Sequence, residues 1–271
     1  MDPQAALEGV VAASPEVAWS IAVLDVASQQ TLAASSPLRV LKTASLAKVF
    51  LLLEVAARFE AGSLDRRELL DRRAVARVED SGLWQHLHVD QLPLVDAAIL
   101  VAAVSDNWAT NALLERVGLD AVQARSRALG YLESRLEDFI RDVRGPDVPA
   151  TVSLGRAADW AEIFARLQRR GLVSSAVDTQ VAAWLETSMD HSMVASAFHL
   201  DPLVGGAASG RFRFYNKTGT DAGVRADAGL LIGRRSLAYC ALANWAPDDD
   251  RVEQVMDGMH AIGQLIRSWA S

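Results

Sequence analysis

The sequence predicts an α+β fold: an antiparallel sheet built from both chain termini and flanked by helices, plus an all-helical lobe. Strand-like segments lie near both ends, whereas the stretch from about 44 to 195 is dominated by helical patterns with short loops. Strands at opposite ends of a chain can share a sheet only if the ends meet. We therefore expect one sheet with the helical segment packed beside it.

The strands of this sheet are expected to be short apolar segments bounded by polar turns. Near the N-terminus they cover 18–26 and 31–34, around a turn at 28–30. Near the C-terminus they cover 211–215, 226–232 and 237–245, and a helix with apolar periodicity follows over 251–269. A further apolar helix is expected over 95–104, and another is expected to begin at Thr151.

The domain organisation that follows is a single domain, residues 1–271, with two lobes. The sheet lobe comprises residues 1–43 with 205–271, and the helical lobe comprises residues 44–204. A cleft is expected where the lobes join.

Composition excludes several classes of partner. With 51% hydrophobic residues, 23% charged residues and a net charge of −7, the chain is typical of a soluble globular protein and not of a nucleic-acid-binding one. No apolar run approaches the roughly 20 residues that span a bilayer. We expect a small-molecule substrate, no membrane partner and a monomer. The first residues lack a signal-peptide pattern, so we expect a cytoplasmic protein, or a periplasmic or secreted one if a signal was removed.

No metal or cofactor is expected. Cys240 is the only cysteine, which excludes an intrachain disulfide, and its apolar surroundings indicate a small core residue. His86 and His88 are two positions apart without a further residue to complete a metal-binding pattern.

Lys48 is an unusual residue for its surroundings. The chain has only three lysines, and Lys48 precedes an apolar stretch that indicates a buried helix, where an ammonium is costly. Ser45 is three residues earlier, so on a helix the two side chains share one face. Burial lowers the pKa of a lysine, and a neutral amine can deprotonate a serine hydroxyl, whereas an arginine cannot.

Two further motifs give this pair a context. A Ser-Asp-Asn motif at 105–107 follows the apolar helix, and a Lys-Thr-Gly motif at 217–219 follows the strand 211–215. Ser-x-x-Lys, Ser-Asp-Asn and Lys-Thr-Gly in this order are typical of serine β-lactamases and penicillin-binding proteins. The chain therefore resembles that superfamily, most closely its class A β-lactamases, over nearly its whole length. The resemblance implies the two-lobed fold of the family and a link to antibiotic resistance.

The resemblance also implies catalytic roles. Ser45 would attack the carbonyl, with Lys48 as its proton acceptor, directly or through water. Ser105 would relay a proton to the leaving nitrogen, Asn107 would position Lys48 and the substrate amide, and Lys217 would support Ser105 electrostatically. Asp106 is expected to be structural.

Substrate binding is implied for the Lys-Thr-Gly strand. The backbone amides of Ser45 and Thr220 would form an oxyanion hole. Thr218, Gly219 and Thr220 would line the substrate site, with both threonines flanking the carboxylate of the substrate. Arg225, after the turn at 223–224, would bind that carboxylate; the alternative is a solvated arginine at the strand edge.

Trp84 falls where the family places an aromatic wall of the cleft. The alternative is a tryptophan of the hydrophobic core.

The chain departs from the family where a glutamate should activate the water that hydrolyses the acyl-enzyme. The family carries this glutamate in a Glu-x-x-Leu-Asn motif. Here the glutamate position falls on Ile140, and no Leu-Asn pair follows. Four nearby acids are candidates for a substitute base or for pairing with the neighbouring arginines: Glu137, Asp138, Asp142 and Asp147. The stretch 193–210 is longer than the family's connection, and its Gly and Ser content suggests a flexible loop that covers the cleft or lies on the surface.

The sequence thus predicts a class A β-lactamase-like serine hydrolase that forms an acyl-enzyme on Ser45 and hydrolyses β-lactam amides slowly. Two alternatives stay open. One is a serine esterase or peptidase of the same fold with a non-β-lactam substrate. The other is a β-lactam-binding receptor that stays acylated.

Overall fold

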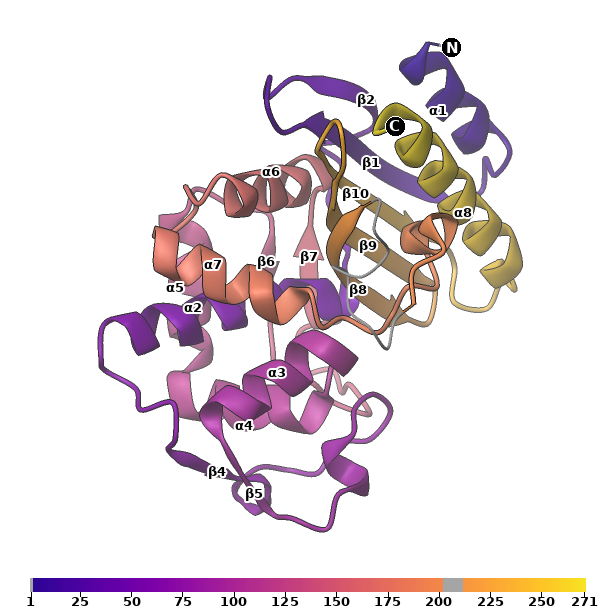
Figure 1. Ribbon diagram of the computed structural model, residues 1–271. Coiled ribbons are helices and arrows are strands. Elements are labelled where there is room, and N and C mark those ends of the chain that lie inside the picture. The colour runs from indigo at the N-terminus through magenta and orange to yellow at the C-terminus, as the bar shows by residue number, and fades with distance from the viewer. Residues whose placement is uncertain (1, 202–211) are drawn as a thin grey trace.

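The computed structural model describes residues 2–201 and 212–271. A five-stranded antiparallel sheet in the order β2-β1-β10-β9-β8 is built from both ends of the chain, as predicted (Figure 1). Its strands are β1 (Ala18–Asp25), β2 (Thr31–Ser35), β8 (Arg213–Asp221), β9 (Val224–Ile232) and β10 (Leu237–Asn244). The N-terminal strand β1 pairs with the C-terminal strand β10, with Ala22 opposite Cys240. Cys240 is fully buried, as expected for a core residue.

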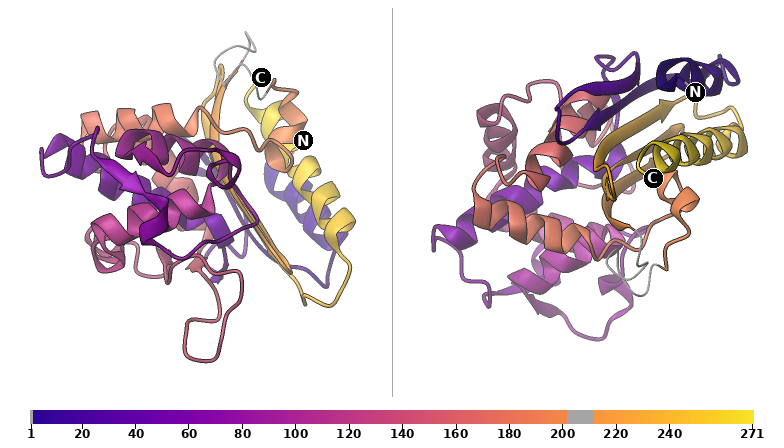
Figure 2. Two further views of the ribbon diagram at one scale, coloured as in Figure 1. Left: turned by 90° about the horizontal axis from the view of Figure 1, so that it is seen from below. Right: turned by 45° about the horizontal axis from the view of Figure 1, so that its top comes forward.

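Two terminal helices cover the outer face of the sheet, α1 (Pro3–Ala12) and α8 (Val252–Trp269) (Figure 2). Within the apolar stripe of α8, Val255, Met259 and Ile266 are fully buried. Helix α1 was not predicted from the sequence, although Asp2 caps it by accepting a hydrogen bond from the amide of Gln4. Its weakly amphipathic composition does not indicate a helix until the sheet and α8 are present to bury it.

The other face of the sheet packs against α6 (Ala157–Gln168) and, beyond it, the remaining helices. The latter are α2 (Lys48–Glu60), α3 (Leu94–Val104), α4 (Asn107–Val117), α5 (Leu119–Ala128) and α7 (Ser175–Leu185). Helix α2 is central: its residues 48–56 are all buried, and it contacts α3, α4, α5 and α7. In the described part of the chain, no helix is long and apolar enough to cross a membrane.

Short segments between the helices differ from the prediction. Residues 151–156, where a helix was expected to begin, contain strand β7 (Ser153–Gly155), and α6 starts only at Ala157. Strand β7 lies between β3 (Leu41–Lys42) and β6 (Arg135–Leu136), while β4 (Leu69–Asp71) pairs with β5 (Gln91–Pro93). Two- and three-residue strands are too short to show a periodicity in the sequence. Such segments become strands because they pair with residues far along the chain.

Four 3₁₀-helices complete the described elements: η1 (Ala44–Ala47), η2 (Arg72–Ala74), η3 (Trp84–His86) and η4 (Val194–Phe198). Element η4 packs against α8 on the outer face of the sheet. Part of the long connection 193–210 is therefore an ordered turn, whereas its residues 202–210 lie outside the described residues. The division into lobes at 43 and 204 stays a prediction, and the packing of η4 places 194–198 with the sheet.

Candidate active site

Ser45 lies in the 3₁₀ turn that leads from β3 into α2, next to a strained residue. Ala44 has φ +46°, a left-handed conformation that a residue with a Cβ rarely adopts. The carbonyl of Ala44 accepts a hydrogen bond of 2.6 Å from the Ser153 hydroxyl, which also bonds the Thr43 hydroxyl at 2.7 Å. These buried contacts hold the turn in its strained form and fix the backbone on which Ser45 stands.

Lys48 is the first residue of α2 and is fully buried. Its Nζ donates to the Ser105 carbonyl at 2.6 Å, the Ser105 hydroxyl at 3.2 Å and Asn107 Oδ1 at 2.8 Å. Burial, together with the positive charge of Lys217, lowers the pKa of Lys48 well below its usual value. A neutral amine in this place can accept a proton from a neighbouring hydroxyl.

Ser105 joins the two buried lysines. Its hydroxyl oxygen lies 3.2 Å from Lys48 Nζ and 3.0 Å from Lys217 Nζ. The residue is in the left-handed conformation, φ +56°, at the C-terminal end of α3, which turns its side chain toward the lysines. The three lysine and serine groups therefore form a continuous path for a proton.

The other two residues of the Ser-Asp-Asn motif hold the turn in place. Asp106 accepts hydrogen bonds from the backbone amides of Leu83, Trp84 and Ala109, which confirms that it is structural. Asn107 accepts from Lys48 and donates Nδ2–H to the Glu79 carbonyl at 3.1 Å, so its amide orientation is fixed from both sides.

Strand β8 brings the Lys-Thr-Gly motif against the Ser45 turn. Lys217 is almost completely buried, donates to Ser105 and to the Thr218 carbonyl, and has its pKa lowered by burial to about 8. At Gly219 a Cβ would lie 2.2 Å from the Thr43 carbonyl oxygen and 3.0 Å from the Ser45 amide nitrogen. Only glycine lets the strand approach the Ser45 turn this closely.

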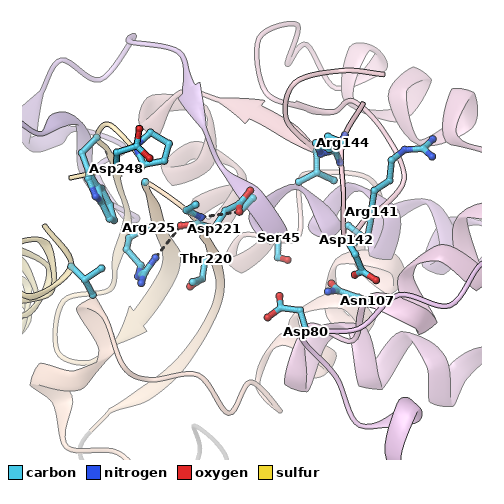
Figure 3. Close-up of a pocket in the computed structure, with 18 of the residues that line it drawn as sticks. Ser45, Asp80, Asn107, Arg141, Asp142, Arg144, Thr220, Asp221, Arg225 and Asp248 are labelled. Atoms are coloured by element: carbon cyan, nitrogen blue, oxygen red, sulfur yellow. Dashed lines mark hydrogen bonds between the residues drawn. The ribbon is translucent and has the colours of Figure 1, made fainter. Parts of the chain in front are cut away.

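Seven of the predicted site residues line two hollows, whereas Lys48, Gly219 and Trp84 line neither of them. The larger, about 850 Å³, contains Ser45 with Asn107 and Asp142 on one side and Thr220 and Arg225 on the other (Figure 3). The smaller, about 340 Å³, is lined by Ser105, Lys217 and Thr218 together with Asp190 and Met189. The structure thus places Ser45, Lys48, Ser105, Asn107 and Lys217 together, but it divides the expected carboxylate site. Thr218 faces the smaller hollow, and Thr220 and Arg225 face the larger one.

Arg225 is half-buried beside Thr220, its partner in the register of β8 and β9. Its guanidinium donates to the carbonyls of Asp221, at 3.2 Å, and Val224, at 2.8 Å, and stacks over the Trp245 ring at 5.7 Å. It is therefore more than a solvated strand-edge arginine, because it forms part of the wall of the larger hollow.

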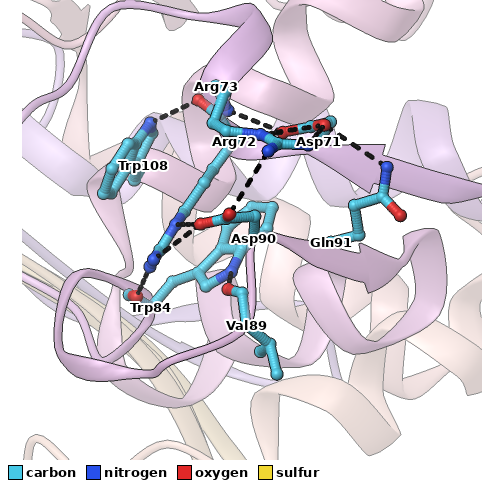
Figure 4. Close-up of polar contacts among 8 residues, drawn as sticks. All are labelled: Asp71, Arg72, Arg73, Trp84, Val89, Asp90, Gln91 and Trp108. Atoms are coloured by element: carbon cyan, nitrogen blue, oxygen red, sulfur yellow. Dashed lines mark hydrogen bonds and ion pairs between the residues drawn. The ribbon is translucent and has the colours of Figure 1, made fainter.

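Trp84 does not form an aromatic wall, which corrects the expectation from sequence. It is fully buried, its indole N–H donates to the Val89 carbonyl at 3.0 Å, and its carbonyl accepts from Arg72 (Figure 4). The alternative of a core tryptophan is the one observed. Asp80, which the sequence analysis did not select, lines the larger hollow on this side in a left-handed conformation, φ +67°.

The acids near the expected deacylation position have different partners. Glu137 pairs with Arg135 at 2.6 Å, and buried Asp138 pairs with Arg141 and Arg144, both at 2.8 Å.

Among the four candidate acids, only Asp142 lines the larger hollow, and it accepts hydrogen bonds from the Glu79 amide. Asp147 is exposed and does not line it. Ile140 itself lines the hollow, with its backbone held by Asn111 through two reciprocal hydrogen bonds of 2.9 Å.

A buried carboxyl lies on the opposite face of the sheet from Lys217. Asp227 Oδ1 accepts hydrogen bonds from Asn216 Nδ2 and the Tyr239 hydroxyl, each at 3.0 Å. Burial raises the pKa of Asp227 to about 7. Asn216, the residue before Lys217, also donates to the Asp190 carbonyl at 3.2 Å, so this network supports the strand that carries the motif.

The described residues contain no group of three or more His, Cys, Asp or Glu side chains arranged to hold a metal ion.

Comparisons with known proteins agree with this geometry. A family model described as the beta-lactamase enzyme family matches residues 2–269. Among curated proteins, none matches the chain by sequence. Solved structures with the same fold include a beta-lactamase from Sphaerobacter thermophilus, 23% identical, with a TM-score of 0.86 over 98% of this chain and 97% of that one. A beta lactamase from Xanthomonas campestris is 18% identical, with a TM-score of 0.80 over 98% and 97%. A leucine-to-glutamate variant of PBP-A, in an acyl-enzyme complex with penicillin G, is 16% identical, with a TM-score of 0.82 over 98% and 95%.

Proposed function

Since the chain belongs to the beta-lactamase enzyme family and is therefore a serine hydrolase acting on β-lactam amide bonds, we propose that Ser45 is its nucleophile and that the acyl-enzyme forms readily but is released slowly. The observation that carries this proposal is the hydroxyl of Ser105 between the Nζ atoms of Lys48 and Lys217. In this position the Ser105 hydroxyl can pass a proton from Lys48 to the leaving group, while Lys217 donates a hydrogen bond to it.

Acylation proceeds in two proton steps. The neutral amine of Lys48 accepts the Ser45 hydroxyl proton as Oγ attacks the lactam carbonyl carbon, giving a tetrahedral intermediate. The lactam C–N bond then breaks, and the leaving nitrogen takes a proton from Ser105, which is replaced from Lys48. Lys217 stays an ammonium and keeps the Ser105 oxygen polarised throughout.

The negative charge on the carbonyl oxygen is stabilised by the backbone amides of Ser45 and Thr220. The close approach that Gly219 allows between β8 and the Ser45 turn supports this pairing. Removing one such donor in other serine hydrolases costs about 3 to 4 kcal/mol of transition-state stabilisation.

Slow release follows from Ile140. Hydrolysis of the ester on Ser45 needs a base to activate a water. Ile140 lines the hollow, and the resemblance implies a glutamate at its position. Glu137 and Asp138 are occupied by arginines. Asp142 faces the hollow, but its carboxylate already accepts hydrogen bonds from the Glu79 amide. The acyl-enzyme that the leucine-to-glutamate variant of PBP-A forms with penicillin G supports the acylation half of the proposal.

The test is to mix the protein with penicillin G and follow its intact mass. We expect an adduct of the mass of penicillin G that decays over minutes to hours, and no adduct with Ser45→Ala. Rapid hydrolysis of short-chain esters without any penicillin adduct would instead favour an esterase of the same fold. An adduct that never decays would favour a receptor.

A further inference from the structure

The hydroxyl of Thr218, the threonine of the Lys-Thr-Gly motif, already donates a hydrogen bond to the carboxylate of Asp190. Thr218 Oγ1 donates to Asp190 Oδ2 at 2.7 Å, and the other carboxylate oxygen accepts from the Ser192 amide at 3.1 Å and the Ser192 hydroxyl at 2.6 Å. Thr218 is buried, and this hydrogen bond already uses its hydroxyl hydrogen. An internal carboxylate therefore sits beside the residue that was expected to bind the carboxylate of a substrate.

The charge of the smaller hollow is balanced by this residue. Lys217 supplies one positive charge to its lining and Asp190 supplies one negative charge. Although burial alone would raise it, the hydrogen bonds from Ser192 and Thr218 hold the pKa of Asp190 below its usual value, so it stays ionised at neutral pH. Arg225 lies in the larger hollow and donates to backbone carbonyls, and its charge also interacts with that of Asp190. Asp190 therefore offsets part of the positive potential of Arg225 as well as that of Lys217.

A carboxylate entering this hollow meets the ammonium of Lys217, whose charge Asp190 already offsets, and a Thr218 hydroxyl whose proton is already donated to Asp190. It is also repelled by the carboxylate of Asp190, because two like charges in a partly buried site repel each other strongly. A neutral group meets no such penalty, and a cationic group gains an attraction to Asp190. The hollow adjoins Ser105, which faces the leaving group in the proposed reaction.

We infer that Asp190 is a specificity-determining residue that disfavours substrates with a carboxylate on the leaving-group side of the scissile bond and favours those with a neutral or cationic group there. This inference rests on the proposed function. It gives the substrate class a definite chemistry, an amide or ester whose leaving group is uncharged or carries an amine.

Three probes with one bicyclic scaffold test it: penicillin G, its methyl ester and its 2-(diethylamino)ethyl ester, which are anionic, neutral and cationic. The rate of adduct formation on Ser45 is measured by intact mass and divided by each probe's rate of alkaline hydrolysis. In the wild-type protein, both esters are expected to react about tenfold or more faster than penicillin G. In Asp190→Asn, the penicillin G rate rises about tenfold while the methyl ester rate changes less than about twofold.

The matched control is Asp257→Asn, which removes one negative charge from the exposed side of α8 and should leave all three rates unchanged. A wild-type preference for penicillin G overturns the inference, and this ratio needs no variant should Asp190→Asn fail to fold. An equal change of all three rates in Asp190→Asn also overturns it, because that is the result of a merely structural role. Adducts with unchanged ratios leave the proposed function standing, whereas no adduct from any probe overturns both.

Discussion

Replacing Ile140 by glutamate should convert slow release into turnover. The side chain is half-buried at the edge of the larger hollow, and its backbone is held by Asn111 independently of the side chain. Ile140→Glu therefore keeps both backbone hydrogen bonds and loses about 1 kcal/mol of apolar burial, roughly half the value of a fully buried isoleucine. A positioned carboxylate base contributes roughly 10²- to 10⁴-fold to a proton transfer, which is the expected gain in the deacylation rate.

The assay isolates that step. The acyl-enzyme is formed with penicillin G, excess reagent is removed, and loss of the adduct is followed by intact mass. Ile140→Gln is the matched control, because it has the same size and polarity class without a basic carboxylate. The reasoning is refuted if the Glu and Gln variants release the adduct at the same rate, or if the wild-type protein already releases it as fast as Ile140→Glu.

Three further predictions concern pH and packing. Because burial lowers the pKa of Lys217 to about 8, the acylation rate should fall as pH rises through about 8; a flat profile from pH 6 to 10 would contradict a role for its ammonium. Asp227 has a folded pKa of about 7, above its unfolded value, so its unfolded form ionises first and stability should fall as pH rises from about 4 to about 7. Urea unfolding of Asp227→Asn at several pH values should show a weaker fall of stability with pH than the wild-type protein shows. The same pH dependence in both proteins would exclude the Asp227 carboxyl as its cause. Gly219→Ala should destabilise the fold by about 1 to 3 kcal/mol and slow acylation of Ser45, whereas an unchanged melting temperature and rate would show that β8 can move away.

The sheet, the central helices and the five catalytic candidates could be predicted because each has a local signal. The apolar residues of α8 recur at the period of a helix, and the strands are short apolar segments bounded by turns. The three motifs lie next to the ends of these helices and strands. The strand that carries Lys217 was predicted to stop at Tyr215, yet β8 continues to Asp221. Polar and glycine residues obscure the strand pattern there, and pairing with β9 extends the strand.

Other features depend on contacts between residues far apart in the sequence. Trp84 looked like a cleft residue because of its position, but the carboxylate of Asp106 ties its backbone into the core. Asp190 and Thr218 are 28 residues apart in the sequence, so no local pattern predicts the hydrogen bond between them. Asp80 enters the hollow through a left-handed backbone that its sequence neighbours do not indicate.

The central claim is that Ser45 is acylated quickly and freed slowly, and an intact-mass time course with penicillin G, followed by peptide mapping, tests it most directly. We expect an adduct confined to the peptide containing Ser45, formed well before it decays and absent from Ser45→Ala. Turnover of penicillin G without a detectable adduct, or an adduct that persists in Ser45→Ala, would contradict it.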